Sequence, residues 1–116
     1  MVRSTQEVYD HHQSAFNPPN LEKLMEDYAD DAILLTLEDE FVGKEAIRGF
    51  FENAFEAFPN LTISFEKTSV VGDTFLEQWS GESDNGTFPH GVATFTIQDG
   101  MIQRQTEWME FVPKEA

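Results

Sequence analysis

Two glutamates lie three residues apart in the last strand-like stretch of the chain, residues 105–111, which reads QTEWMEF. Successive side chains of a β-strand point to opposite faces of the sheet, so Glu107 and Glu110 cannot share a face. One carboxylate is therefore aimed at the interior. A carboxylate in an apolar interior loses its hydration, and its pKa rises toward neutrality. Such a group is suited to general acid/base chemistry at physiological pH.

A histidine on an otherwise apolar helical face is the second candidate. His12 lies within a stripe that runs from Val8 to Phe16 at the i, i+3/i+4, i+7 spacing of a helix. Its neighbour His11 lies about 100° round the helix, so we expect it to be solvated. His12 is then either a satisfied core residue or a site residue. In the second case Glu107 acts as a base and the imidazole donates a hydrogen bond to a developing oxyanion.

The composition argues against several other kinds of chemistry. The 116 residues include no cysteine, which excludes disulfides, thiolate metal sites and a cysteine nucleophile. The histidines, His11, His12 and His90, do not have metal-ligand spacing, and no G-x-S-x-G, P-loop or dinucleotide motif occurs, so we expect neither a metal nor a cofactor. A net charge of −15 repels phosphate backbones, which argues against nucleic-acid binding.

The hydropathy pattern argues against a membrane protein. The longest apolar run, at residues 32–37, is far too short to cross a bilayer. The N-terminal residues have no apolar core of the kind that a secretory signal carries. We therefore expect a cytoplasmic protein that forms a single domain over residues 1–116.

The elements that position these groups follow from hydrophobic periodicity and turn residues. Helices are predicted over residues 5–16, 21–28 and 44–58, and strands over 32–37, 61–71, 74–81, 92–97 and 101–112. Gly72 and Gly100 mark tight hairpin turns, and residues 82–91 form a looser loop. Helices followed by an antiparallel meander predict an α+β domain, in which one curled sheet carries the helices on its concave face.

Several short phrases strengthen this prediction by their order: YADDA at 28–32, GKEAI at 43–47, GD at 72–73 and DGMI at 99–102. Their sequence resembles the nuclear-transport-factor-2-like superfamily over nearly the whole chain, and most closely its SnoaL-like branch, which includes polyketide cyclases and is related to ketosteroid isomerases and limonene epoxide hydrolase. The resemblance implies a cone-shaped fold: a strongly curved, mostly antiparallel sheet with three helices, closed at one end and open to a pocket at the other.

The functional residues of those relatives are only partly present. The positions that correspond to the two aspartates and the tyrosine of ketosteroid isomerases hold Thr36, Ala93 and His12, which disfavours steroid isomerisation by that mechanism. The last-strand acid of limonene epoxide hydrolase and of SnoaL-like cyclases corresponds to Glu107. The other two catalytic residues of the hydrolase are not retained.

Alternation along the last strand leaves two possible inward faces. The resemblance favours the odd-numbered set, which aims Gln105, Glu107 and Met109 into the cone, although a β-bulge would reverse this assignment. Ile102 and Trp108 then face outward. An exposed apolar strip on a sheet is typical of an interface, so we expect a symmetric homodimer through the convex face.

We therefore expect a cofactor-independent acid/base enzyme for a small, largely apolar molecule, of the isomerase, cyclase, dehydratase or epoxide-opening type, with Glu107 and His12 as catalytic residues. The expected substrate-binding residues are Tyr9, Phe16, Tyr28, Phe55, Phe58, Trp79, Phe95, Gln105 and Met109. The alternative is a small-molecule-binding or assembly module with the same cone and no catalysis. Loss of the relatives' aspartates favours this alternative, and the retained last-strand acid favours the enzyme.

Overall fold

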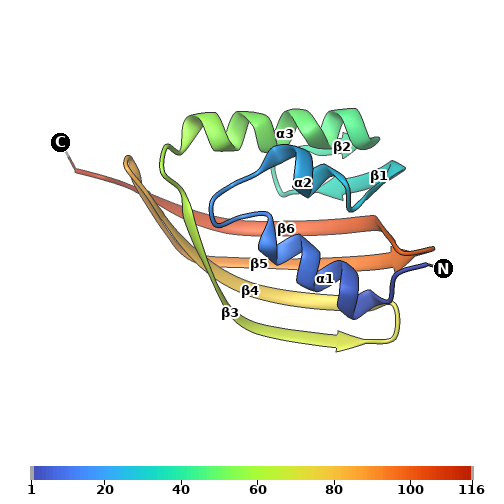
Figure 1. The fold of residues 1–116 in the computed structure, drawn as a ribbon. Helices are drawn as coiled ribbons and strands as arrows, with labels where there is room; N and C mark the ends of the chain where they lie inside the picture. The colour runs from blue at the N-terminus through green and yellow to red at the C-terminus, as the bar shows by residue number, and fades with distance from the viewer. Residues whose placement is uncertain (1, 116) are drawn as a thin grey trace.

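Three helices and a six-stranded sheet make up the part of the chain that the computed structural model describes, residues 2–115 (Figure 1). The helices are α1 (Thr5–Ser14), α2 (Leu21–Met25) and α3 (Lys44–Ala57). The strands are β1 (Tyr28–Leu35), β2 (Glu40–Val42), β3 (Thr62–Val71), β4 (Thr74–Ser83), β5 (Gly86–Gln98) and β6 (Met101–Pro113). None of the helices in these residues is both long and apolar enough to cross a membrane.

The sheet has the strand order β2-β1-β6-β5-β4-β3. Strands β1 and β6 run parallel, and every other neighbouring pair is antiparallel. Figure 1 shows the four long strands bending together, with α1 and α3 on the side toward which they curl. Helix α3 packs on β1 and β2, and α1 packs on β3 and β4. The predicted α+β class and the curved, mostly antiparallel sheet are thus confirmed.

The helix boundaries follow from local capping chemistry. Helix α1 begins with a capping box, in which the Glu7 backbone N–H donates to Ser4 Oγ at 3.1 Å and the Ser4 N–H donates to the Glu7 carboxylate at 2.8 Å. The Asn20 side chain caps α2 by accepting from the Lys23 N–H. Helix α2 is shorter than predicted, because Tyr28 already belongs to β1.

The predicted loop over residues 82–91 is wrong. Strand β4 continues to Ser83 and β5 starts at Gly86, so only two residues separate the strands. Ser83 Oγ donates to the Gly86 carbonyl at 3.0 Å and closes the turn. A Cβ at Gly86 would overlap the Phe111 ring, which packs directly on this glycine. The hairpin is therefore longer than its polar sequence indicated. The short edge strand β2 was not predicted either.

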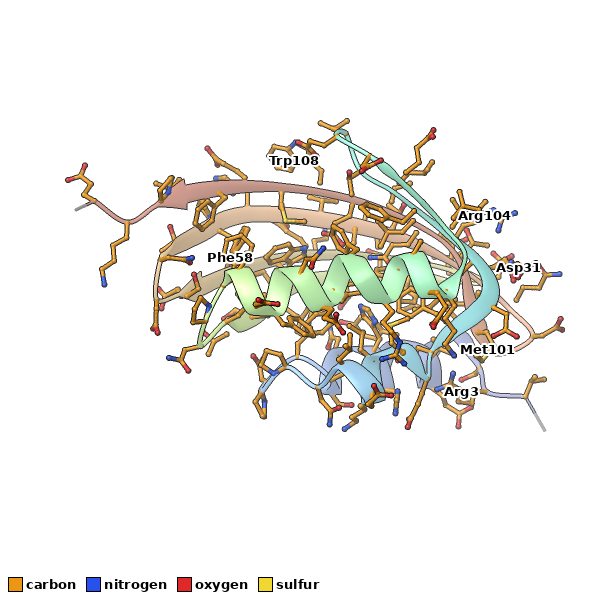
Figure 2. The ribbon with its side chains drawn as sticks, turned by 90° about the horizontal axis from the view of Figure 1, so that it is seen from above. Arg3, Asp31, Phe58, Met101, Arg104 and Trp108 are labelled. Atoms are coloured by element: carbon orange, nitrogen blue, oxygen red, sulfur yellow. The ribbon has the colours of Figure 1, made fainter. Side chains whose placement is uncertain are left out.

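A β-bulge corrects the predicted direction of Ile102. Ile97 pairs with Ile102, whereas Thr96 pairs with Arg104, so Gln103 is an extra residue in β6. The bulge turns Ile102 into the core, where it is fully buried, and the prediction that it faces outward is wrong. Beyond the bulge the predicted parity holds. Trp108 is 45% exposed, and Figure 2 shows it on the side of β6 away from the helices.

A buried carboxylate ties the N-terminal residues to the closed end of the cone. Asp27 is fully buried and accepts from Arg3 Nη1 at 2.8 Å, while His11 Nδ1 lies 2.8 Å from the same oxygen. Arg3 also donates to the Gly100 carbonyl at 2.9 Å, and Figure 2 shows it beside Met101. The expectation that His11 is solvated is wrong, because its ring is held against Asp27.

We predict that Asp27→Asn lowers the free energy of unfolding by roughly 2–4 kcal/mol, since it leaves the Arg3 guanidinium beside a buried neutral amide in place of its carboxylate partner. Urea unfolding at neutral pH measures the change. The control is Asp30→Asn, which removes an exposed carboxylate and should cost less than about 0.5 kcal/mol. Equal effects of the two substitutions would show that the buried network contributes nothing.

Candidate active site

A cavity of about 590 Å³ lies between the concave face of the sheet and helix α3. Its size matches that of pockets that hold small molecules. Its apolar wall is built chiefly from aromatic side chains. They are Phe16, Phe41, Phe50, Phe51, Phe55, Phe58, Phe65, Phe88, Phe111 and Trp79, with Ala54, Leu61, Ile63 and Met109 between them and Trp108 at the border. The polar lining residues are His12, Thr36, Glu38, Asp39, Glu77, Gln105 and Glu107.

Two glutamates occupy one row of the sheet on its concave face. Glu77 on β4 pairs with Ala93 on β5, and Ala93 pairs with Glu107 on β6. Ala93 is fully buried and contributes only a methyl group. The two carboxyl side chains therefore flank a shallow position in the sheet, with no bulky group between them. This row places both of them in the lining of the cavity.

The next row explains how Trp79 reaches Glu107. Trp79 pairs with Gly91, and Gly91 pairs with Met109. A Cβ at Gly91 would overlap the Trp79 indole, so the ring lies directly against this glycine. In this position Trp79 Nε1 donates to Glu107 Oε2 at 2.9 Å. The missing side chain at Gly91 is what gives the indole room to cross β5.

The second oxygen of Glu107 is held from its own strand. Gln105 Nε2 donates to Glu107 Oε1 at 3.0 Å, and the Tyr28 hydroxyl donates to Gln105 Oε1 at 2.5 Å. Gln105 and Tyr28 are both buried, so the chain of hydrogen bonds is shielded from water. Both Glu107 oxygens thus receive an N–H donor, which is the arrangement that suits an ionised carboxylate.

Burial raises the pKa of both carboxyl groups to about 8. For Glu107 the hydrogen bonds from Trp79 and Gln105 oppose this rise, because they favour the charged form. For Glu77 the negative charge of Glu107 adds to the rise, and one side-chain hydrogen bond from Gln13 opposes it. Glu77 Oε1 has no hydrogen-bond partner. Glu107 is therefore the group that ionises first, and Glu77 keeps its proton to higher pH, which separates the pair into a base and an acid.

His12 belongs to the acid side of this pair. Its Nε2 lies 3.9 Å from Glu77 Oε2, which is too long for a hydrogen bond. Burial lowers the pKa of His12 to about 3, so the ring is neutral at physiological pH. Its Nδ1 has no partner, and its ring packs edge-on against Phe95. The structure therefore places Glu77, rather than Glu107, beside His12.

Most of the predicted site residues meet in this cavity. His12, Phe16, Phe55, Phe58, Trp79, Gln105, Glu107 and Met109 line it. Tyr9, Tyr28 and Phe95, which we expected to bind substrate, lie in the hydrophobic core instead and do not line it. Tyr28 still acts on the site through its hydrogen bond to Gln105. His90 is exposed and lies outside the lining.

Sequence reasoning missed Glu77. Its parity with Trp79 was visible, since both are odd-numbered residues of one strand, and Trp79 was expected to reach the pocket. Because Glu77 lies on the same face of the strand as Trp79, the same expectation would have placed Glu77 in the cavity. The pairing of Glu77 with Glu107 depends on the β4-β5-β6 register, which no local pattern specifies.

The turn between β1 and β2 supplies the polar residues at one side of the cavity. Thr36 Oγ1 accepts from the backbone N–H groups of Asp39 at 3.0 Å and Glu38 at 3.2 Å, which fixes the turn. Glu38 and Asp39 are exposed. Across residues 2–115, no group of three or more acidic or histidine side chains is placed to hold a metal ion.

The sequence matches the model of the SnoaL-like domain over residues 8–105. Among curated proteins, none matches it. A solved structure of a proposed polyketide cyclase from Sinorhizobium meliloti is 22% identical, with a TM-score of 0.75, over 88% of this chain and 94% of that chain. A proposed SnoaL-like polyketide cyclase from Jannaschia sp. CCS1 is 17% identical, with a TM-score of 0.80, over 91% and 85% of the two chains.

A third structure is a protein with a ketosteroid isomerase-like fold from Catenulispora acidiphila, in complex with trimethylamine. It is 14% identical, with a TM-score of 0.73, over 88% of this chain and 84% of that chain. These matches confirm the resemblance that the sequence indicated. At such identities they show a shared fold, and the activity has to be argued from the site itself.

We predict that Glu77→Gln makes folding stability less dependent on pH. The pKa of Glu77 is about 8 in the folded protein, against an ordinary value of 4.5. Between pH 4.5 and pH 8, the folded state keeps a proton on Glu77 that the unfolded state has lost. The protonated carboxyl group therefore stabilises the fold fully below about pH 4.5, and this contribution disappears as the pH rises through 8. Between pH 5 and pH 8.5, the free energy of unfolding of Glu77→Gln should rise by roughly 2–4 kcal/mol relative to that of the wild type. Urea unfolding at the two pH values measures the change.

The matched control is Glu110→Gln, which removes an exposed glutamate of β6 and should leave the pH profile parallel to that of the wild type. The lowered pKa of His12 has the opposite effect on stability, which falls as the pH drops below 6.5, the ordinary pKa of histidine. This contribution is common to all three proteins, so it cancels when their profiles are compared. A Glu77→Gln profile parallel to the wild-type profile would contradict the raised pKa.

Proposed function

The chain belongs to the SnoaL-like domain family, and from this premise we propose that it is a cofactor-independent acid/base enzyme that moves a proton on a small, largely apolar substrate. The observation that carries the proposal is the pair of carboxyl groups on either side of Ala93 in an aromatic cavity. Glu107 is poised as the base and Glu77 as the acid. Isomerisation, cyclisation, dehydration and epoxide opening all need such a pair.

The proposed reaction begins with Glu107. Its carboxylate, aligned by Trp79 and Gln105, takes a proton from the substrate and becomes neutral. Negative charge develops on a substrate oxygen, and the Glu77 carboxyl group stabilises it by donating a hydrogen bond to that oxygen, keeping its own proton. The neutral imidazole of His12 lies next to Glu77, at 3.9 Å between Nε2 and Oε2, and adds no charge beside it. Return of a proton from Glu107 to another substrate atom restores the starting state.

Raised pKa values support this division of work. Its raised pKa makes the Glu107 carboxylate a stronger base than an ordinary glutamate, while the hydrogen bonds from Trp79 and Gln105 favour its charged form. Glu77, with a pKa of about 8 that the negative charge of Glu107 helps to raise, retains its proton at neutral pH. The aromatic wall is apolar, and a low local polarity strengthens the electrostatic interactions of the carboxyl groups. The same wall favours substrates with an apolar body.

We predict that Glu107→Gln slows proton exchange by about 10²–10⁴-fold, which is the range for loss of a positioned general base. The assay incubates a panel of small apolar ketones with the protein in D₂O and follows exchange of the protons next to the carbonyl by NMR. Glu110→Gln is the matched control, since it changes the other glutamate of β6 and leaves the cavity intact. Equal exchange with Glu107→Gln and wild type would refute the proposed role.

The alternative function is a binding module without catalysis. It is supported by Thr36 and Ala93, which stand where ketosteroid isomerases have their aspartates, and by the complex of the Catenulispora acidiphila relative with trimethylamine. In this case the hydrogen bonds on Glu107 only stabilise the fold. Binding of the ketones with no exchange above the solution rate would favour this alternative.

The convex face of the sheet fits a homodimer interface, as the sequence led us to expect. Leu76, Thr94, Thr106 and Leu35 lie in one row across β4, β5, β6 and β1. Leu35 is 42% exposed and Leu76 37% exposed, and Trp108 adds a third large apolar side chain to the outer face of β6. The row carries no charge, in a chain with 22 acidic residues, so a second copy can pack there without repulsion.

We predict that Leu76→Asp converts the dimer to a monomer, because it introduces a charge into the centre of the apolar row. Multi-angle light scattering after size exclusion measures the mass. Leu37→Asp is the control: Leu37 is 79% exposed on the turn between β1 and β2, away from that row, and its substitution should leave a dimer. A monomeric wild-type protein would rule out this interface.

A further inference from the structure

Apart from His12, the ionisable side chains that line the cavity are all acidic. They are Glu38, Asp39, Glu77 and Glu107, and neither lysine nor arginine lines it. The whole chain, with 22 acidic against seven basic residues, adds a negative field of the same sign. The two N–H donors nearest the centre, from Trp79 and Gln105, are already used by Glu107. An anionic ligand would find repulsion here and no free donor among these groups.

The aromatic wall favours the opposite charge. Ring faces carry partial negative charge and attract a cation that lies within about 6 Å of the ring centre. Nine phenylalanines and Trp79 surround the cavity, so a cation inside it faces rings from α3 and from the sheet at once. An alkylated ammonium group suits such a wall best, since its weak hydration makes it less costly to desolvate than a bare ammonium group.

Two buried polar atoms beside the cavity have no partner: Glu77 Oε1 and His12 Nδ1. Both residues line the cavity and are almost completely buried. Buried polar atoms without hydrogen bonds are rare and costly, and they mark a position where a partner belongs. The N–H of a protonated tertiary amine would supply the donor that Glu77 Oε1 lacks, and a quaternary ammonium group would present its polarised methyl C–H groups to the same oxygen. Ionised Glu107 would stabilise either cation.

We propose that the cavity binds a lipophilic organic cation, in which a tertiary or quaternary ammonium group lies at the Glu77–Glu107 pair and an apolar body lies among the phenylalanines. The inference rests on the proposed function, because it uses the same cavity and the same carboxyl pair, and it defines the chemical class of the substrate. The acid/base step would then act on a carbon or oxygen of a molecule whose ammonium group anchors it.

The binding should strengthen as the pH rises. A cation favours the ionised form of the pair, whose pKa burial raises to about 8 in the free protein, so binding releases a proton until the pH passes that value. The other titratable groups near the pair are His12 and Tyr9 on α1 and Tyr28 on β1; α3 presents only phenylalanine and alanine to the cavity. His12 stays neutral in this range, and burial raises the pKa of both tyrosines.

Three probes of nearly equal shape and different charge test the proposal: benzyltrimethylammonium, its neutral carbon isostere neopentylbenzene, and benzylsulfonate. Binding is followed by the fluorescence of Trp79 in the Trp108→Phe background, where Trp79 is the sole remaining tryptophan. About 0.3 M NaCl screens attraction to the acidic surface. We expect the cation to bind at least tenfold more tightly than the neutral isostere at pH 8, and the anion to leave the fluorescence unchanged.

Variants locate the effect at the carboxyl pair. Glu77→Gln should reduce the preference for the cation over the neutral isostere at least fivefold, while Glu110→Gln should leave it unchanged. The affinity for the cation should rise between pH 6 and pH 8, although the probe itself does not titrate. The affinity for the neutral isostere should stay constant over this range.

Equal or tighter binding of the neutral isostere would overturn the proposal and leave the proposed acid/base function standing, since a neutral substrate would occupy the same cavity. Failure of all three probes to bind would also overturn it. Loss of the proposed function has a separate signature, which is ordinary carboxyl titration of Glu77 and Glu107 or unchanged proton exchange in Glu107→Gln. A preference for the cation would survive that result.

Discussion

Two carboxyl groups that lie side by side in one apolar cavity constrain the rest of the site. Neither Glu77 nor Glu107 can ionise at its ordinary pKa of 4.5, because burial removes the water that would stabilise the charge. The two groups also repel each other once both are charged. The protein resolves this conflict by giving one N–H donor to each oxygen of Glu107, whereas Glu77 receives only the hydrogen bond from Gln13 and its Oε1 has no partner. The asymmetry assigns the base and the acid.

The scaffold around the pair consists of small residues at positions where bulk would destroy the arrangement. Ala93 leaves room for both glutamates, and Gly91 leaves room for the Trp79 indole. Helix α3 forms the opposite wall of the cavity with its phenylalanines, so the carboxyl groups face aromatic rings. The strand register, the small residues Ala93 and Gly91, and the aromatic face of α3 together give these two glutamates their raised pKa values.

Alternation along β6 predicted Glu107 in the interior correctly, because the strand is regular from residue 104 onward. The same rule failed for Ile102, where the bulge at Gln103 reverses the faces. On β4, Trp79 was expected in the pocket, but the same parity was not applied to Glu77, so Glu77 was not identified as a site residue. His11 was misjudged because its partner, Asp27, lies 16 residues away and meets it only through tertiary packing. Local patterns thus determined the elements, and long-range register determined the site.

The central claim is that a single buried pair holds its proton near neutrality. Titration of the side-chain carboxyl carbons of selectively ¹³C-labelled glutamate by NMR tests it most directly, with Glu77→Gln and Glu107→Gln spectra to assign the two signals. The account predicts that the Glu77 signal titrates near pH 8 and that the Glu107 signal titrates before it, both above the ordinary pKa of 4.5. Two signals that titrate below pH 5 with the rest would contradict it.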